Sequence, residues 1–475
     1  MKVFGSAILM YLFICTLSFS QDAVVIGSRL ELFVDPFLVD SSEGLIFKLH
    51  PPHPREIAIV HNEAWEGNTS GYHTVFEDGD LFRMYYRGSH HDAAAKTMAH
   101  EQVVCYAESE DGIHWIKPNL GVYSFAGSDD NNIIWIGEGA HNFAPFPDTN
   151  PACPRAEKYK AMGSGEDGLY AFVSADGVHW RKMADTPVFT RGMFDSQNNA
   201  FWSELENRYV CYFRSWSGDG YSGYRQISRT TSTDFINWSD PVELDYFGAP
   251  LEHLYTNQII PYDRAEHIYM GFPKRFFPEK NPMQFASGGV SDAVFMSSRD
   301  GVHFKRRLSA YIRPGLQKEQ WICRNNMLAR GLLQTYTAFD DDSKELSLYV
   351  GEGYYQGESD RMRRYTQRLD GFVSLHGDYD GGWFVSKPLI FRGNTLLINV
   401  STSAAGFVMI ELLNKEGNPI PGFSLARAPK LCGDDIAMKV HWNSSAVLAD
   451  YQAAPVRLRC YLKDADLYAI QFKYL

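Results

Sequence analysis

Three carboxylates stand in short polar stretches that recur along the chain: Asp148 in PDTNP, Asp195 in FDSQNN and Glu252 in LEHLYTN. Paired carboxylates are what cleavage of a glycosidic bond needs. One donates a proton to the leaving oxygen, and the other activates water or attacks the sugar carbon. A third acid can hold the sugar and tune the pKa of the donor. We therefore take these three residues as candidate catalytic groups, with Glu66 as a reserve candidate.

Amides, histidines and aromatic residues surround these acids and recur at equivalent places along the chain. Polar side chains are costly to bury without a partner, so their recurrence indicates a wet, ligand-filled centre. For any single carboxylate, a turn cap or a pair with an arginine is an equally good interpretation. The candidate substrate-binding residues are His73, His141, Asn142, Gln197, Asn198, Tyr255, Asn257, Arg214, Arg275, Trp321, Arg324 and Asn325.

Three of these candidates, Arg214, Arg275 and Arg324, could read a sulfate or a carboxylate, because guanidinium groups bind such anions in a bidentate way. The competing interpretation is that they pair with acids of neighbouring strands. An anionic sugar is therefore one hypothesis for the substrate.

The elements that would position these residues are marked by a repeated box, Ser109 to Trp115 (SEDGIHW). Its later copies carry Asp176, Asp234 and Asp300 at intervals of roughly 60 residues, the range of a repeat architecture. Asp-Gly favours a tight turn, and the serine and aspartate can bond nearby backbone N–H groups. The boxes come late in each repeat, so we interpret them as structural turns on an outer rim.

The repeats predict an all-β protein with a five-bladed β-propeller over residues 62–360, followed by a β-sandwich over 361–475. Innermost propeller strands converge on a central funnel, which would bring the candidate residues together. Residues 21–61 are predicted to be a strap, in which Pro51, Pro52 and Pro54 break regular structure.

Residues 1–20 carry one lysine, a short apolar run and small residues before Gln21, which predicts a cleaved secretory signal and a secreted or periplasmic protein. A net charge of −12 argues against nonspecific binding to nucleic acid or acidic membranes. No later segment predicts membrane insertion. An exported chain permits disulfides, and Cys432 with Cys460 is one candidate pair.

The cysteines and histidines show no C-x-x-C or H-E-x-x-H spacing, so no metal site and no cofactor are predicted, with a structural Ca²⁺ ion left open. The oligomeric state is also left open.

The boxes, the aromatic strand around Tyr85 and Tyr86, and the acid-bearing inner strands resemble the five-bladed propellers of glycoside hydrolase families 32, 43, 68, 117 and 130. Residues 30–40 and the tail from Gly371 also resemble a broad set of uncharacterised bacterial family-32-like proteins. The resemblance implies one acid from each of the first three blades. The chain lacks the family-32 motifs W-x-N-D-P-N-G, R-D-P and E-C-P, and Asp195 stands where those enzymes carry glutamate.

We therefore expect a secreted, exo-acting glycoside hydrolase that binds an oligosaccharide or polysaccharide. Two alternatives remain open: a carbohydrate-binding propeller without catalysis, and a phosphorylase of the family-130 type, in which arginines and a histidine would hold phosphate.

Overall fold

The computed structural model describes residues 23–285, 288–339 and 342–475, and the predicted signal segment lies outside them. Within these ranges the chain is built from strands, with three 3-10 helices at Arg155–Glu157, Lys318–Gln320 and Leu448–Tyr451. The predicted all-β class is confirmed. No helix in the described ranges is both long enough and apolar enough to cross a membrane.

The first three sheets each contain four antiparallel strands in chain order, so each strand pairs with the one before it. The first has β6 (Gly71–Asp78), β7 (Leu81–Gly88), β10 (Val103–Ser109) and β11 (Ile133–Ile136). The second has β12 (Ala144–Pro147), β13 (Tyr159–Ser164), β14 (Leu169–Ser174) and β15 (Trp180–Lys182). The third has β16 (Asn199–Ser203), β17 (Arg208–Trp216), β18 (Arg225–Ser232) and β19 (Val242–Glu243).

The fourth repeat is split at Phe272-Pro273, because proline has no N–H to continue a ladder. One half has β21 (Ile260–Tyr262), β22 (Ala265–Gly271), β25 (Met296–Ser298) and β26 (Lys305–Arg306). The other half has β20 (His253–Leu254), β23 (Lys274–Phe277) and β24 (Val290–Ala293). A separate two-stranded hairpin joins β8 (His91–Asp92) and β9 (Thr97–Met98).

The fifth sheet takes its outer strand from the beginning of the chain. β27 (Leu333–Tyr336), β28 (Lys344–Glu352) and β29 (Arg361–Arg368) are followed by β5 (His53–Val60), which pairs with β29. The expected break at Pro54 is wrong, since Pro54 lies inside β5 opposite Tyr365. An edge strand tolerates proline because one of its sides needs no N–H donors.

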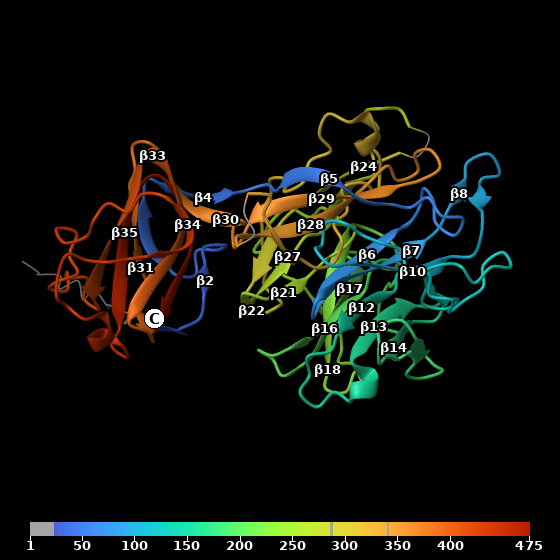
Figure 1. The fold of residues 1–475 in the computed structure, drawn as a ribbon, viewed down its shortest axis with the longest axis horizontal. Coiled ribbons are helices and arrows are strands. Elements are labelled where there is room, and N and C mark those ends of the chain that lie inside the picture. Colours follow the sequence, from blue (N-terminus) through green and yellow to red (C-terminus); the bar gives the residue numbers. More distant parts are fainter. Residues whose placement is uncertain (1–22, 286–287, 340–341) are drawn as a thin grey trace, which may run out of the picture.

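A ten-stranded sheet completes the fold and stands beside the others in Figure 1. Its N-terminal strands are β1 (Val24–Gly27), β2 (Glu31–Leu32), β3 (Val39–Glu43) and β4 (Leu45–Leu49). Its C-terminal strands are β30 (Val373–Gly377), β31 (Gly382–Ser386), β32 (Leu389–Phe391), β33 (Thr395–Asn414), β34 (Asp434–Lys439) and β35 (Val456–Lys473). The two ends of the chain therefore share one hydrophobic core.

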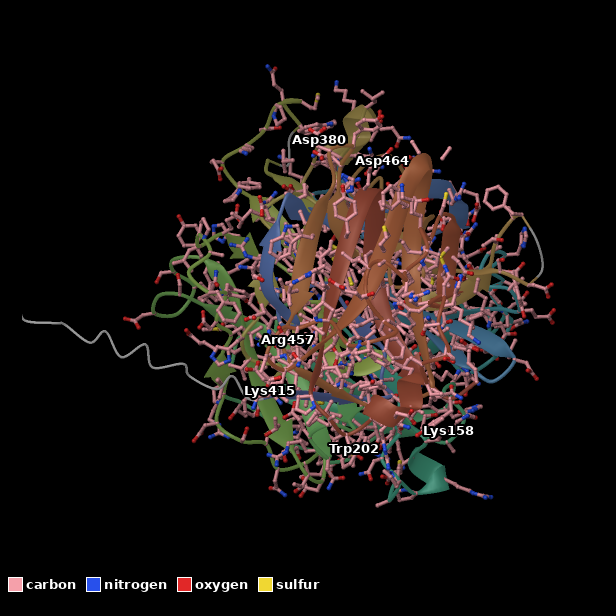
Figure 2. The ribbon with its side chains drawn as sticks, turned by 90° about the vertical axis from the view of Figure 1, so that its left-hand side faces the viewer. Lys158, Trp202, Asp380, Lys415, Arg457 and Asp464 are labelled. Atoms are coloured by element: carbon pink, nitrogen blue, oxygen red, sulfur yellow. The ribbon has the colours of Figure 1, made fainter. Side chains whose placement is uncertain are left out.

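Ion pairs hold the N-terminal segment to β35 on one side and to the fourth repeat on the other. Arg457 on β35, labelled in Figure 2, pairs with Asp40 at 2.7 Å. Arg299, within the fourth box, pairs with Glu31 of β2 at 2.8 Å and with Asp35 at 2.9 Å. Burial disfavours the charged form of Glu31, but its contacts with His267 and Arg299 outweigh this and lower its pKa to about 2.

The four boxes are tight turns, as the sequence indicated. In the first, Asp111 Oδ1 accepts from the backbone N–H groups of Ile113 and His114 at 2.7 and 2.8 Å, and Ser109 Oγ accepts from Gly112 N–H at 2.9 Å. The same bonds recur in the other three copies, at Asp176, Asp234 and Asp300. The expected disulfide is wrong, because Cys432 is exposed, Cys460 is buried and both are free thiols.

The first and fifth repeat sheets meet where Thr74 of β6 bridges to Arg330, just before β27. Gly331 follows with a φ of +111°, and a Cβ atom there would lie 2.0 Å from the carbonyl oxygen of Val75. No side chain can occupy that space unless the two segments separate.

We expect Gly331→Ala to lower the free energy of unfolding by about 3 kcal/mol or more, because strain and a backbone clash act together. Gly315 also has a positive φ, of +72°, but its Cβ would meet nothing within 4 Å, so Gly315→Ala should cost about 1 kcal/mol. Denaturant unfolding of both variants measures this, and equal losses would show that the contact with Val75 is not needed.

Candidate functional site

Four cations surround the aromatic ring of Tyr255. The distances from its centroid are 3.9 Å to Lys274 Nζ, 4.2 Å to the Arg214 guanidinium, 5.4 Å to that of Arg225 and 6.0 Å to that of Arg324. Cations are attracted to the faces of aromatic rings, which partly offsets their mutual repulsion. We call these four side chains, together with Tyr255, the cation cluster.

The cluster is assembled from separate elements. Arg214 lies on β17, Arg225 on β18 and Lys274 on β23, while Tyr255 follows β20. Arg324 precedes β27 and has a φ of +67°, a conformation that non-glycine residues seldom adopt. Its Nη1 donates to the hydroxyls of Tyr354 and Tyr355 at 2.9 and 3.3 Å.

Asp195 is the carboxylate that pairs with this cluster. Its Oδ2 accepts from Arg214 Nη1 at 2.6 Å, and its side chain is 49% exposed. Arg214 Nη2 donates to the backbone oxygen of Tyr255 at 2.6 Å, so one guanidinium fixes both residues. The hydroxyl of Tyr72 donates to the backbone oxygen of Asp195 at 3.2 Å.

Two tyrosines beside Asp195 have pKa values that move in opposite directions. Burial raises the pKa of Tyr72 well above its usual value, and the nearby Tyr255 raises it further. Burial also opposes ionisation of Tyr255, but the charges of Arg324 and Arg214 outweigh it and lower the pKa of Tyr255. A hydrogen bond with Tyr72 adds to this effect. Of the two, Tyr255 is therefore the more readily ionised.

A second layer of polar side chains supports Tyr72. The Arg87 guanidinium lies 5.0 Å from the Tyr72 ring centroid and donates to the Tyr354 hydroxyl at 3.2 Å and to the backbone oxygen of Thr69 at 2.7 Å. His141 lies 3.3 Å from Arg87 Nη1. Burial and the charges of the surrounding arginines lower the pKa of His141 to about 3, so it is a neutral hydrogen-bonding group at neutral pH.

The other three predicted acids are paired elsewhere. Asp148 is buried with Lys160 at 2.7 Å, and it follows β12 at the end opposite to His141. Glu252 pairs with Arg275 and Arg306, and Glu66 accepts from Tyr86 and from Lys117. The structure therefore does not bring Asp148, Asp195 and Glu252 together, and their joint catalytic role stays a prediction.

The predicted amides lie beneath the cluster and bind backbone atoms. Asn142 donates to the backbone oxygens of Phe194 and Ser196, and Asn198 donates to the same two oxygens. Asn257 donates to the backbone oxygens of Gln197 and Tyr212, Gln197 donates to those of Tyr72 and His73 on β6, and Asn325 donates to Glu319 O. All five side chains are buried, and they form the floor of the site.

The remaining predicted residues divide between the site and its surroundings. His73 is buried in a chain of bonds in which Asp360 contacts His61 at 2.6 Å and His61 contacts His73 at 3.0 Å. Burial raises the pKa of Asp360 to about 6. Arg275 pairs with Asp292, which lies opposite it on the neighbouring strand β24. Trp321 donates to the backbone oxygen of Gly315.

The structure thus brings His141, Asp195, Arg214, Tyr255 and Arg324 to one place. Tyr72 and Arg87 also lie at this place, and sequence reasoning missed two further residues there, Arg225 and Lys274. Lys274 stands directly before the selected Arg275, and strand alternation puts the two side chains on opposite faces. Alternation indicates that one of the two faces the site, but it does not say which one.

Lys274 is the most enclosed member of the cluster. Its side chain is buried, and in the described part of the chain its Nζ has no hydrogen-bond partner. Burial lowers its pKa well below the usual value, and the charges of Arg324, Arg214 and Arg225 lower it further. Across the described ranges, no three His, Cys, Asp or Glu side chains are arranged to hold a metal ion.

No family model matches this chain. Two curated relatives are uncharacterized proteins of Mycobacterium tuberculosis, from strains H37Rv and CDC 1551. Each is 28% identical over 159 residues, which is 32% of this chain and 46% of the relative. The match thus spans about half the length of these relatives.

The solved structures to which the chain is similar include glycoside hydrolases and a phosphorylase, as the sequence motifs indicated. A beta-1,2-mannobiose phosphorylase from Listeria innocua is 13% identical with a TM-score of 0.45, covering 68% of this chain and 97% of its own. A GH32 beta-fructofuranosidase from Bombyx mori is 10% identical with a TM-score of 0.39, covering 90% and 95%. The function of this chain has to be inferred from its own site.

The difference in pKa between Tyr72 and Tyr255 can be measured by ultraviolet titration of phenolate absorbance. We expect a tyrosine that ionises below the ordinary range in the native protein and is lost in Tyr255→Phe, because its pKa is lowered by Arg324 and Arg214. Tyr72→Phe should keep this step but move it to higher pH, since the hydrogen bond is lost. A low-pH step that persists in Tyr255→Phe would contradict the assignment.

Proposed function

We propose that this chain is a carbohydrate-active enzyme, a glycoside hydrolase that removes a sugar bearing an anionic group from the end of an oligosaccharide or polysaccharide. One observation carries the proposal: the guanidinium of Arg214 binds both Asp195 and the backbone of Tyr255. Three further cations lie beside this pair. Asp195 can act as an acid, Tyr255 can act as a nucleophile, and the cations can hold an anion.

The first chemical step would transfer the sugar to the enzyme. Asp195 in its protonated form gives its proton to the glycosidic oxygen as the bond from that oxygen to the anomeric carbon breaks. The phenolate oxygen of Tyr255 forms the new bond to this carbon, which makes tyrosine the nucleophile in place of a second carboxylate. Tyr72 keeps its proton and stabilises the phenolate through its hydrogen bond.

The second step would release the sugar. Asp195, now ionised, removes a proton from water, and the water oxygen attacks the anomeric carbon while the bond to Tyr255 breaks. The products are the free sugar, the Tyr255 phenolate and a reprotonated Asp195. An anion that binds Arg214 would compete with Asp195 for this guanidinium.

Removal of a terminal sugar follows from the buried floor. Asn142, Gln197 and Asn257 lie beneath the cluster and are 2% exposed or less, so a polysaccharide chain cannot pass through the centre. A site closed on one side accepts the end of a chain and releases one sugar at a time. This supports exo action over cleavage within a chain.

We also propose an architecture for this enzyme. The five repeats form the blades of a β-propeller, the last of which includes β29 and is closed by β5, and the ten-stranded sheet is a β-sandwich of β30–β35 with β1–β4. The sequence of residues 1–20 supports export to the periplasm or the medium.

A phosphorylase is the second candidate, favoured by the same excess of cations. In that reaction inorganic phosphate would attack the anomeric carbon in place of water, and the arginines would hold it. Turnover that requires phosphate would identify this reaction.

If the hydrolase mechanism holds, Asp195→Asn and Tyr255→Phe each lower kcat/KM by about 100-fold or more, because each removes a group that acts in the transition state. The assay would release sugar from a panel of neutral, carboxylated and sulfated oligosaccharides. Glu243→Gln and Tyr336→Phe, at exposed positions, are matched controls that should keep full activity.

Unchanged turnover in both variants would remove Asp195 and Tyr255 from the mechanism. Binding of a panel member by the native protein without any turnover, with or without phosphate, would identify a carbohydrate-binding protein instead of an enzyme.

A further inference from the structure

Lys274 carries a buried amine for which the described residues supply no hydrogen-bond acceptor. Its side chain is 1% exposed, and its Nζ has no hydrogen-bond partner in the described part of the chain. Burying an ammonium group without a partner is costly, so such a group either stays neutral or awaits a ligand. The Nε atoms of Arg87, Arg214 and Arg225 are likewise buried donors without a partner among the described residues.

Lys160 is the internal comparison for Lys274. It is also nearly inaccessible, with a side chain 3% exposed, but Asp148 lies 2.7 Å from its Nζ. Burial opposes the charged form of Lys160, but the contact with Asp148 raises its pKa. Where this chain buries a lysine for structure, it therefore provides a carboxylate. At Lys274 none of the described carboxylates forms an ion pair, and the neighbouring charged groups are arginines.

The groups that face Lys274 come from every element packed against it. β17 supplies Arg214, β18 supplies Arg225, the segment before β27 supplies Arg324 and Cys323, and the segment after β20 supplies Tyr255. The carboxylate of Asp195 pairs with Arg214 and is half-exposed. Three guanidinium groups therefore repel a charge on Lys274, and an added anion would reverse this balance.

We propose that the cation cluster binds a tetrahedral oxyanion, and that Lys274 takes up one proton from solvent when the anion binds. We call this anion-binding site the seat. The oxyanion is either a sulfate ester on the sugar or free phosphate. This inference rests on the proposed function for the identity of the sugar, but the seat itself requires only the cations. It makes Lys274 a binding residue and assigns it no chemical step.

The distribution of donors favours a tetrahedral group over a carboxylate. The four cations belong to four different elements and lie within 6.0 Å of one ring centroid, so their donors approach from several directions. A carboxylate offers two oxygens in one plane and is matched by a single guanidinium. A sulfate ester or a phosphate offers three or four oxygens in three dimensions, enough for several guanidinium groups and an ammonium.

Proton uptake gives the binding a defined pH dependence. In the free protein, burial and the charges of the neighbouring arginines disfavour the ammonium form of Lys274 and lower its pKa. The bound anion favours the ammonium form, so one proton is taken from solvent with each anion. Affinity should then rise as pH falls, until the amine is already protonated in the free protein.

Isothermal titration calorimetry on the full chain tests the proposal, with inorganic sulfate, inorganic phosphate, galactose 6-sulfate and glucuronate as probes. Titrations at pH 7.5 in two buffers that differ in ionisation enthalpy report the number of protons taken up. We expect about one proton per anion and a tenfold or greater loss of affinity in Lys274→Met. Lys305→Met, at an exposed position, is the matched control and should bind normally.

The relative affinities distinguish the two sources of the anion. Tighter binding of galactose 6-sulfate than of phosphate indicates a substituent on the sugar, and the reverse indicates free phosphate. Tighter binding of glucuronate than of all three other probes would overturn the tetrahedral seat. So would the absence of proton uptake in the native protein, a measurement that does not depend on how any variant folds.

Failure of the seat and failure of the proposed hydrolase give different results. Asp195→Asn and Tyr255→Phe keep all four cations, so both variants are expected to lose turnover while still binding the anion. Anion binding without turnover of any saccharide would leave the seat in place and remove the hydrolase. Turnover of sulfated saccharides with unchanged kinetics in Lys274→Met would keep the hydrolase and remove the seat.

Discussion

The hydrogen bonds of Gln197 and Gln258 at the centre of the molecule are the constraint on which the site depends. Gln197 Nε2 donates to the backbone oxygens of Tyr72 and His73, and its Oε1 accepts from Gln258 Nε2 at 2.8 Å. Gln258 in turn donates to the backbone oxygen of Leu328. Segments of four sheets are joined by two buried amides, and Tyr72 is held at a φ of +54° beside Tyr255.

Above this floor the distribution of charge is unlike that in the rest of the molecule. Two buried cations elsewhere meet acids, in the pairs of Lys160 with Asp148 and Arg275 with Asp292. Around Tyr255 the cations outnumber the paired carboxylate, that of Asp195, and several of their N–H groups have no acceptor within the described ranges. Because such donors are costly to leave unpaired, the cluster is best explained as a binding site for an anion.

The sequence predicted what depends on local chemistry. The boxes at Asp111, Asp176, Asp234 and Asp300 identified turns, since serine, aspartate and glycine make such turns without help from distant residues. It did not predict that β1–β4 pair with strands beyond residue 372 or that Pro54 lies within an edge strand, because pairing over such separations leaves no local pattern. At the site it selected Arg275 and passed over Lys274. Alternation fixes that neighbours face opposite ways, but only the three-dimensional register decides which one faces Tyr255.

The most direct test of the central claim, that the cations around Tyr255 hold an anion, is a crystal of the full chain soaked in selenate. Selenate is a tetrahedral oxyanion whose anomalous scattering identifies its position. The account predicts an anomalous peak between Lys274 and Arg214, with oxygens within hydrogen-bond distance of both. Peaks confined to the outer surface, with Lys274 still lacking an acceptor, would contradict it.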